Sequence, residues 1–234
     1  MKLNRIRNLL GRGAKMPAYD FNALLEEVRR VRKISEDLVI VPKPTGGNWL
    51  GINIATRQLF GSMVVELPQH YSSQLLTDEE LESLSKEILA LKFRNVVFSS
   101  LPLYADKMIA RLYTATQVST VIHGTFSEAG VGGKISESIH LSLQLLQQGH
   151  IQKIAAVRKD VTDFVSRMWG REAYTLGNKC VIPENIKPSA LAPAGCSIGV
   201  FGTENFNKNI HNQVAGAALI KESTVYVTQP QLYQ

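Results

Sequence analysis

From residue 34 onward, short apolar runs alternate with longer amphipathic ones, and this alternation restricts the fold more than any other feature of the chain. Buried strands of a parallel sheet are short apolar runs, whereas the helices between them repeat apolar residues at a spacing of three or four. The sequence therefore predicts an α/β fold, a Rossmann-like parallel sheet flanked by helices. We predict strands at 38–41, 63–67, 95–98, 120–122 and 154–157, and helices near 48–58, 78–91, 103–115, 136–148 and 160–169.

The helix predicted at 78–91 has a specific start signal. Thr77 is followed three residues later by Glu80, so each side chain can bond the backbone N–H of the other and form a capping box. Leu81, Leu84 and Ile88 then recur at helical spacing. The pattern predicts an amphipathic helix that begins beside Thr77.

The rhythm breaks once, at PENIKPSALAPAGC, which holds three prolines and little periodicity. Such a stretch is typical of a surface linker. A strand, a helix near 207–220 and a second strand follow, and one βαβ unit of this size buries little apolar surface by itself. We expect it to begin a larger, truncated domain. The predicted parts are a basic helical extension at 1–33, a Rossmann-like domain at 34–182, a linker at 183–196 and the first βαβ of a second Rossmann-like domain at 197–234.

The net positive charge of the chain comes from the N-terminal extension. Residues 1–33 carry nine basic and three acidic residues, whereas the rest of the chain carries 17 of each. No nucleic-acid partner is therefore implied. Apolar residues recur at helical spacing here too: Leu3, Ile6, Leu9 and Leu10, then Phe21, Leu24, Leu25 and Val28. Two interpretations stay open: the helices dock on an anionic membrane surface, or they pack on the first domain with their basic faces in solvent.

The remaining composition favours a cytoplasmic protein. If the extension docks on a membrane as just described, the protein is peripheral on the inner face of the cell membrane. The chain shows no secretory signal, and no apolar run approaches the roughly 20 residues that span a bilayer. Cys180 and Cys196 form no disulfide framework and lack zinc-binding spacing. Asp160 and Asp163 are three residues apart, so no Asp-x-Asp clamp exists. We predict no metal site.

Ligands of open α/β sheets bind beyond the carboxyl ends of the strands, so the residues just after each strand are the candidates. Gly46 and Gly47 follow the first strand and precede a helix. Glycines let the backbone approach a ligand, and a helix N-terminus attracts an anion such as phosphate. The alternative is a plain strand-to-helix turn, since neither a Walker loop nor the dinucleotide fingerprint is present.

A histidine and a glycine, His123 and Gly124, follow the strand predicted at 120–122. The glycine permits a sharp exit that leaves the imidazole facing the ligand edge. The imidazole can hydrogen-bond a sugar hydroxyl or a phosphate, and its ordinary pKa near 6.5 leaves it mostly neutral. The alternative is a structural histidine, hydrogen-bonded at the end of a strand.

The second βαβ unit offers a third candidate. Gly202 ends its first strand, and Lys208 falls in the first turn of the following helix. A lysine there opposes the helix dipole, and a bound anion would resolve the conflict. The alternative is a lysine solvated by water.

Together these stretches resemble retaining glycosyltransferases of the GT-B fold, which build bacterial cell-surface polysaccharide and lipopolysaccharide. The resemblance covers roughly residues 36–234 and includes Asn178, in a loop ahead of the linker. It implies that the first domain binds a saccharide or lipid-linked acceptor and that the second binds the nucleotide-sugar. The nucleotide-sugar is a substrate, and no other cofactor is implied.

The resemblance also implies roles for individual residues. Gly46 and Gly47 would lie against the donor diphosphate, and His123 would contact the donor sugar as the catalytic residue. Lys208 would hold the diphosphate. The flanking glycines of the last two motifs, Gly124 and Gly202, would complete the donor-binding set.

Two departures from the family pattern keep alternatives open. Thr203 stands where the family often has arginine, and Asn209 replaces a glycine. The family's acidic pair would lie beyond residue 234. We therefore expect a glycosyltransferase fragment or split half, inactive as this chain alone. The alternative is a non-catalytic Rossmann-like binding or scaffold module; a doubly wound nucleotide-binding protein of another family is disfavoured because no dinucleotide or P-loop fingerprint occurs.

Overall fold

The computed structural model divides the chain into two compact units, Met1–Lys179 and Cys180–Gln234. We describe each unit by itself. The structure describes residues 19–44, 49–68, 75–124, 134–177, 196–200, 216, 219 and 223–227.

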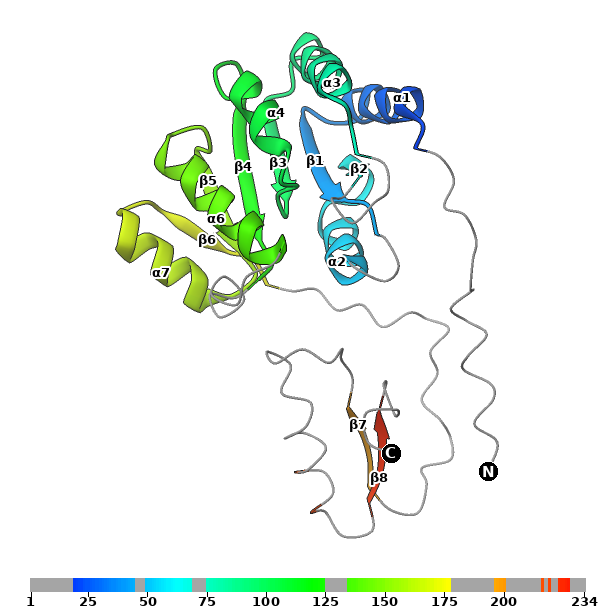
Figure 1. Cartoon of the computed structure of the whole chain (residues 1–234), viewed down its shortest axis with the longest axis vertical. Coiled ribbons are helices and arrows are strands. Elements are labelled where there is room, and N and C mark those ends of the chain that lie inside the picture. Colours follow the sequence, from blue (N-terminus) through cyan, green and yellow to red (C-terminus); the bar gives the residue numbers. More distant parts are fainter. Residues whose placement is uncertain are drawn as a thin grey trace. The chain divides into compact units, whose positions relative to one another are not determined.

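Unit 1 contains a six-stranded sheet in which every pairing is parallel, in the order β2-β1-β3-β4-β5-β6 (Figure 1). This confirms the predicted α/β fold and its five strands. The sixth, β6, was not predicted, because its three residues form no apolar run. The strands are β1 Asp37–Pro42, β2 Val64–Leu67, β3 Asn95–Ser99, β4 Gln117–Ile122, β5 Lys153–Ala156 and β6 Ala173–Thr175.

The connecting helices match the predicted ones to within a few residues. Thr77 and Glu80 form the predicted capping box, with N···O distances of 2.8 and 3.2 Å. In this described part of the chain, no helix is long and apolar enough to cross a membrane. The helices are α1 Phe21–Arg32, α2 Leu50–Phe60, α3 Asp78–Ala90, α4 Ala105–Leu112, α6 Lys134–Gln147 and α7 Lys159–Trp169, with a 3-10 turn η1 at Gly61–Met63.

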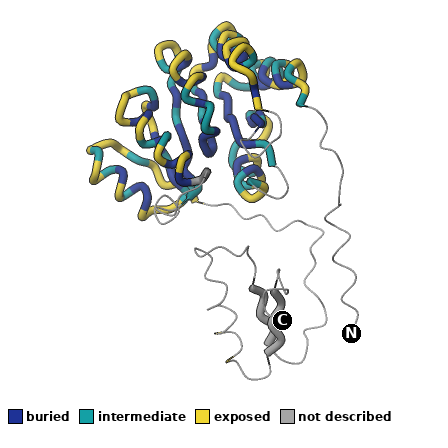
Figure 2. The backbone as a smooth tube through the Cα atoms, in the orientation of Figure 1, coloured by how far each residue is buried: buried dark blue, intermediate teal, exposed yellow. Residues whose placement is uncertain are grey.

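The two faces of the sheet are covered unequally. Successive strand residues point to opposite faces. Leu38 and Ile40 of β1 join the main apolar cluster, to which α1, α3, α4, α6 and α7 contribute. Val39 and Val41 join a small second cluster, in which Ile52 of α2 packs. Among the described helices, only α2 and the 3-10 turn η1 that follows it contribute to this second cluster, and the buried positions concentrate along the central strands (Figure 2).

The strand order explains why α2 stands apart. The chain moves from β1 outward to β2, then crosses back over β1 to β3 and continues in the opposite direction. Parallel crossovers are right-handed, so reversing direction moves the connecting helix to the opposite face. The connection through α2 therefore lies on one face and the later connections on the other. The reversal places a topological switch point between β1 and β3.

The basic helix α1 is part of unit 1. Its apolar residues Leu24, Val28 and Val31 are buried in the main cluster. Its basic face is paired: Arg29 contacts Glu87 at 2.7 Å, and the Arg32 guanidinium donates to the carbonyl of Leu91 at 2.7 Å. For residues 21–32, the structure therefore favours the second interpretation, in which the helix packs on the first domain. Residues 1–18 lie outside the described part.

Unit 2 contains two parallel strands, β7 Cys196–Val200 and β8 Ser223–Val227. Ile198 pairs with Val225 at the centre of their register. Parallel neighbours need a crossover, as the predicted βαβ unit has. Most of the helix predicted at 207–220 lies outside the described residues, with Gly216 in helical conformation.

Phe98 gives a direct test of the main cluster, because its side chain is fully buried. Removing a buried phenyl ring leaves a cavity, so Phe98→Ala should lower the free energy of unfolding by about 3 to 5 kcal/mol. Urea denaturation followed by circular dichroism measures the change. Met168→Ala is the control, because that side chain is 63% exposed and its loss should cost less than about 0.5 kcal/mol. A loss below about 1 kcal/mol for Phe98→Ala would contradict this core.

Candidate functional site

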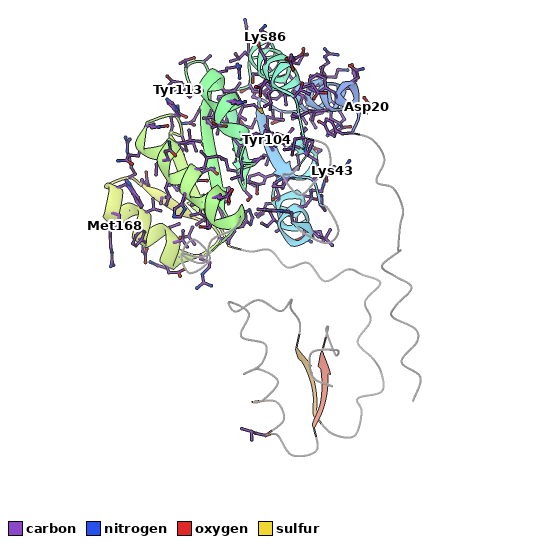
Figure 3. All side chains as sticks on the ribbon, viewed as in Figure 1. Asp20, Lys43, Lys86, Tyr104, Tyr113 and Met168 are labelled. Carbon is purple, nitrogen blue, oxygen red and sulfur yellow. The ribbon has the colours of Figure 1, made fainter. Side chains whose placement is uncertain are left out.

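The candidate site lies at the carboxyl edge of β1, β3 and β4. The switch point between β1 and β3 lies at this edge, because the chain leaves the two strands toward opposite faces of the sheet. Lys43 follows β1, Ser100 follows β3, and His123 with Gly124 follows β4. Figure 3 shows the side chain of Lys43 beside the end of β1.

His123 is hydrogen-bonded to the end of the neighbouring strand. Its Nε2 atom lies 2.8 Å from the Oγ of Ser99, the last residue of β3. Ser99 pairs in register with Val121, so by alternation Ser99, Val121 and His123 share one face of the sheet. It is the face on which α2 packs. This contact is the one that the structural interpretation of His123 anticipates.

A row of hydroxyl groups continues from Ser99 into α2. The Oγ of Ser99 lies 2.6 Å from the Oγ1 of Thr56, and this hydroxyl donates to the carbonyl of Ile52 at 2.7 Å. Ser99 is 1% exposed and Thr56 is 0% exposed. A buried hydroxyl without a partner is costly, so each member of the row stabilises its neighbour. The row ties together three elements that are distant in sequence.

The environment of His123 favours its neutral form. The ring is partly buried, and desolvation lowers its pKa from 6.5 to about 4. The sequence predicted a mostly neutral imidazole from its ordinary pKa alone. Within the folded domain, the side chain carries no charge at neutral pH, so it acts through hydrogen bonds and its lone pair.

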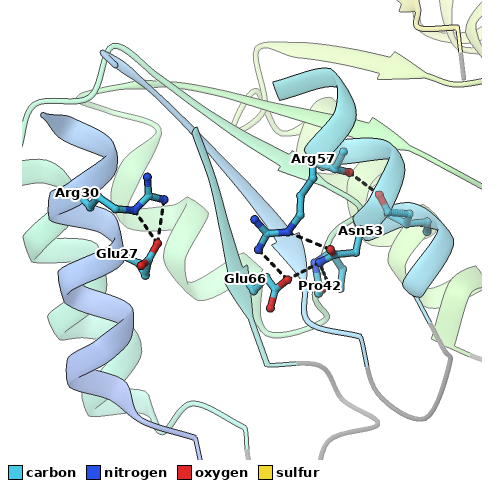
Figure 4. Close-up of polar contacts among 8 residues, drawn as sticks. Glu27, Arg30, Pro42, Asn53, Arg57 and Glu66 are labelled. Carbon is cyan, nitrogen blue, oxygen red and sulfur yellow. Dashed lines mark hydrogen bonds and ion pairs between the residues drawn. The ribbon is translucent and has the colours of Figure 1, made fainter. Parts of the chain in front are cut away.

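A second polar cluster lies at the carboxyl end of β1, where the described chain pauses at residue 44. Asn53 is 4% exposed, and its amide donates to the carbonyl of Pro42 at 3.3 Å and to Glu66 at 2.9 Å. Arg57 contacts the same carboxylate at 2.8 Å, as Figure 4 shows. The cluster fixes α2 against the ends of β1 and β2. It thereby fixes where the loop after β1 begins.

The backbone is strained at this same edge. Trp49, just before α2, has φ +67°, and Ser100, just after β3, has φ +68°. Residues other than glycine rarely adopt this left-handed region, and such strain is concentrated at functional sites. Lys92, with φ +54°, lies in the turn after α3 and not at this edge. Two of the three strained residues of the described chain therefore flank the switch point.

On the opposite face of the sheet, Tyr104 packs against the main apolar cluster and connects two elements. Its hydroxyl donates to the carbonyl of Pro68, so it joins the start of α4 to the chain after β2. Burial raises the pKa of Tyr104 above its ordinary value, which keeps the phenol protonated as a donor. Figure 3 places its ring near the centre of the domain.

Of the residues proposed from sequence, the structure places His123 and Gly124 at the site. Gly46, Gly47, Gly202 and Lys208 lie outside the described residues, as does Asn178. Within the described ranges, no group of three or more His, Cys, Asp or Glu side chains could hold a metal ion.

The sequence analysis missed Ser99, Thr56 and Asn53. Their one visible signal was polarity: each is a polar side chain at a position that the strand or helix pattern directs inward. Pattern analysis cannot tell which inward hydroxyls will meet, because they come from segments more than 20 residues apart.

No protein-family model matches the chain, and no curated protein matches it.

The lowered pKa of His123 predicts a specific dependence of stability on pH. The unfolded chain protonates this side chain below about pH 6.5, whereas the native protein does so only below about pH 4. Between these values the unfolded state binds more protons, so the free energy of unfolding falls as the pH is lowered from 6.5 to 4. His123 accounts for at most about 3 kcal/mol of this fall in the free energy of unfolding.

Urea denaturation across this range measures the effect, and His123→Asn provides the reference because carboxylates titrate equally in both proteins. The difference in stability between wild type and variant should shrink, or reverse, as the pH falls to 4. A constant difference would show that His123 is not desolvated as described.

Proposed function

We propose that this chain takes part in the transfer of a sugar from a nucleotide-sugar, with unit 1 on the acceptor side and unit 2 on the nucleotide-binding side. One observation carries the proposal: a neutral histidine, His123, lies at the carboxyl edge beside the switch point and is held there by Ser99. The resemblance assigns this histidine to the donor sugar.

The chemistry of the edge supports a polyhydroxylated ligand. Sugars are bound through many neutral hydrogen bonds, and a neutral imidazole both recognises hydroxyls and avoids attracting competing anions. The glycine pair after β1 would supply backbone N–H groups to the donor diphosphate. Asn53, bonded to Glu66 and to the carbonyl of Pro42, fixes the end of β1, which precedes the glycine pair in the sequence. The arrangement suits binding and orientation of a substrate, which contribute to catalysis by positioning.

Nucleotide-sugar binding tests the proposal. Saturation-transfer NMR on the full chain, with UDP-glucose and GDP-mannose as first ligands, should give sugar-proton signals. His123→Ala removes one hydrogen bond, worth about 0.5 to 1.5 kcal/mol, so binding should weaken roughly three- to tenfold. His140→Ala is the matched control, because His140 is exposed on α6. Equal binding by both variants, or binding by neither variant nor wild type, would refute the proposed role of this site.

A non-catalytic binding module is the second candidate, because the hydrogen bond of His123 to Ser99 is also one that a structural histidine makes. A transfer assay with a labelled nucleotide-sugar and a saccharide acceptor tests whether this chain alone is an enzyme. Transfer that is lost in His123→Ala would exclude the binding module and would overturn the expectation that this chain alone is inactive. Absence of transfer is the result expected of both candidates.

We also propose contact with an anionic membrane surface, through residues 1–18 only. This segment carries five basic and no acidic residues, and its apolar residues recur at helical spacing. The apolar face of α1 is buried in unit 1, so the second basic segment cannot present it to lipid. Such contact would bring the site close to a lipid-linked acceptor.

Vesicle co-sedimentation tests this contact. Deleting residues 1–18 should abolish binding to phosphatidylserine-containing vesicles, because each basic residue contributes roughly 1 kcal/mol near an anionic surface. Arg30→Gln, which removes a charge paired with Glu27 on α1, should leave binding nearly unchanged. Binding that survives the deletion, or that is equally strong on neutral vesicles, would exclude the proposal.

A further inference from the structure

The hydroxyl row behind His123 determines where its proton lies. Ile52 contributes a carbonyl oxygen, which only accepts, so the single proton of the Thr56 hydroxyl points to it across 2.7 Å. The 2.6 Å contact between Thr56 and Ser99 then needs a proton from Ser99. That leaves Ser99 no proton for His123. The 2.8 Å contact is therefore donated by Nε2 of the imidazole.

A neutral imidazole carries one N–H, and here it sits on Nε2. The other ring nitrogen, Nδ1, consequently has a bare lone pair. In the described part of the chain, Ser99 is the one hydrogen-bond partner recorded for His123. Nδ1 is thus the atom that the ring has left to offer a ligand.

The geometry points to Ser99 and Thr56 as positioning residues that hold His123 as the Nε2–H tautomer, so that its bare Nδ1 accepts a hydrogen bond from a ligand hydroxyl. The oxygens of a phosphate diester, or of the diphosphate of a nucleotide-sugar, carry no proton at neutral pH and would meet this lone pair as a second acceptor. The site at His123 therefore selects a hydroxyl and rejects a proton-free phosphate group. The sequence alone allowed either. That the hydroxyl belongs to a sugar rests on the proposed function, whereas the tautomer does not.

All the hydrogen bonds of the row donate in the same direction, from His123 toward Ile52, because the last acceptor is a carbonyl oxygen. If the row ended in a group that can also donate, the direction could reverse and the imidazole could exchange tautomers. Because a backbone carbonyl in a helix cannot change its role, the direction is fixed by the fold. Ser99 and Thr56 contact no ligand in this arrangement and act through His123.

Nitrogen NMR of the ligand-free full chain, labelled with ¹⁵N-histidine, reads the tautomer directly. At pH 7, the His123 spectrum should show a protonated Nε2 and an unprotonated Nδ1. The reverse pattern, or a charged ring with both nitrogens protonated, would overturn the inference. Because no ligand is present, this result is independent of nucleotide-sugar binding.

Substitutions then separate positioning from simple packing. Thr56→Val keeps the shape but removes the acceptor for the Ser99 proton, so Ser99 can donate to Nε2 and the Nδ1–H form should become populated. Thr56→Ser keeps the hydroxyl and should preserve the wild-type spectrum. Identical histidine spectra in all three proteins would show that Thr56 only fills space.

Ser99→Ala provides a second route should Thr56→Val fail to fold. It removes the partner of Nε2, so the preference for the Nε2–H form should weaken. Ser119→Ala is its matched control, because Ser119 pairs in register with Val97 on the same face of the sheet, one pair further from the site. Loss of the preference in both variants, or in neither, would contradict the role of Ser99.

Two ligands test the chemical selectivity. Millimolar D-glucose should shift the Nδ1 resonance of His123, whereas millimolar dimethyl phosphate, which has no O–H group at neutral pH, should not. A shift with dimethyl phosphate alone, or with neither compound, would refute the hydroxyl assignment while leaving the tautomer result intact.

Discussion

Burial of one face of the parallel sheet against a layer of helices is the constraint on which the rest of unit 1 depends. The main apolar cluster joins β1 and its neighbours to α1, α3, α4, α6 and α7. The observed strand order, with right-handed crossovers, places the first connection, through α2, on the other face. The position of the site follows, because this change of face creates the switch point between β1 and β3.

The site combines stabilisation with chemistry in the same residues. Ser99 and Thr56 are buried hydroxyls that need partners, and burial lowers the pKa of His123 and so favours its neutral form. Each of these groups is the hydrogen-bond partner of the next. One row of hydrogen bonds therefore offsets the cost of burying the polar side chains and also orients the imidazole. The strain at Trp49 and Ser100 shows that the backbone departs from its ordinary conformations around the same edge.

Much of the fold could be predicted from the sequence because its signals are local. The Thr77 capping box and the run of leucines after it define α3 within one segment, and the short apolar strands predict a parallel sheet. His123 could be predicted as a candidate because it directly follows such a strand. β6 could not, since its exposed residues carry no apolar pattern. The helical spacing of Phe21–Val28 likewise could not reveal whether its apolar face meets lipid or the core.

The sequence by itself determined that this chain is an α/β protein, that its net positive charge lies in residues 1–33, and that a histidine directly follows one of the central strands. Only the tertiary structure decided the strand order, the burial of α1 and the partners of His123. The physical reason is that periodicity and capping act between residues a few positions apart, whereas the contact of Thr56 with Ser99 joins residues 43 positions apart. Such a contact exists only after the sheet has brought its strands and α2 together.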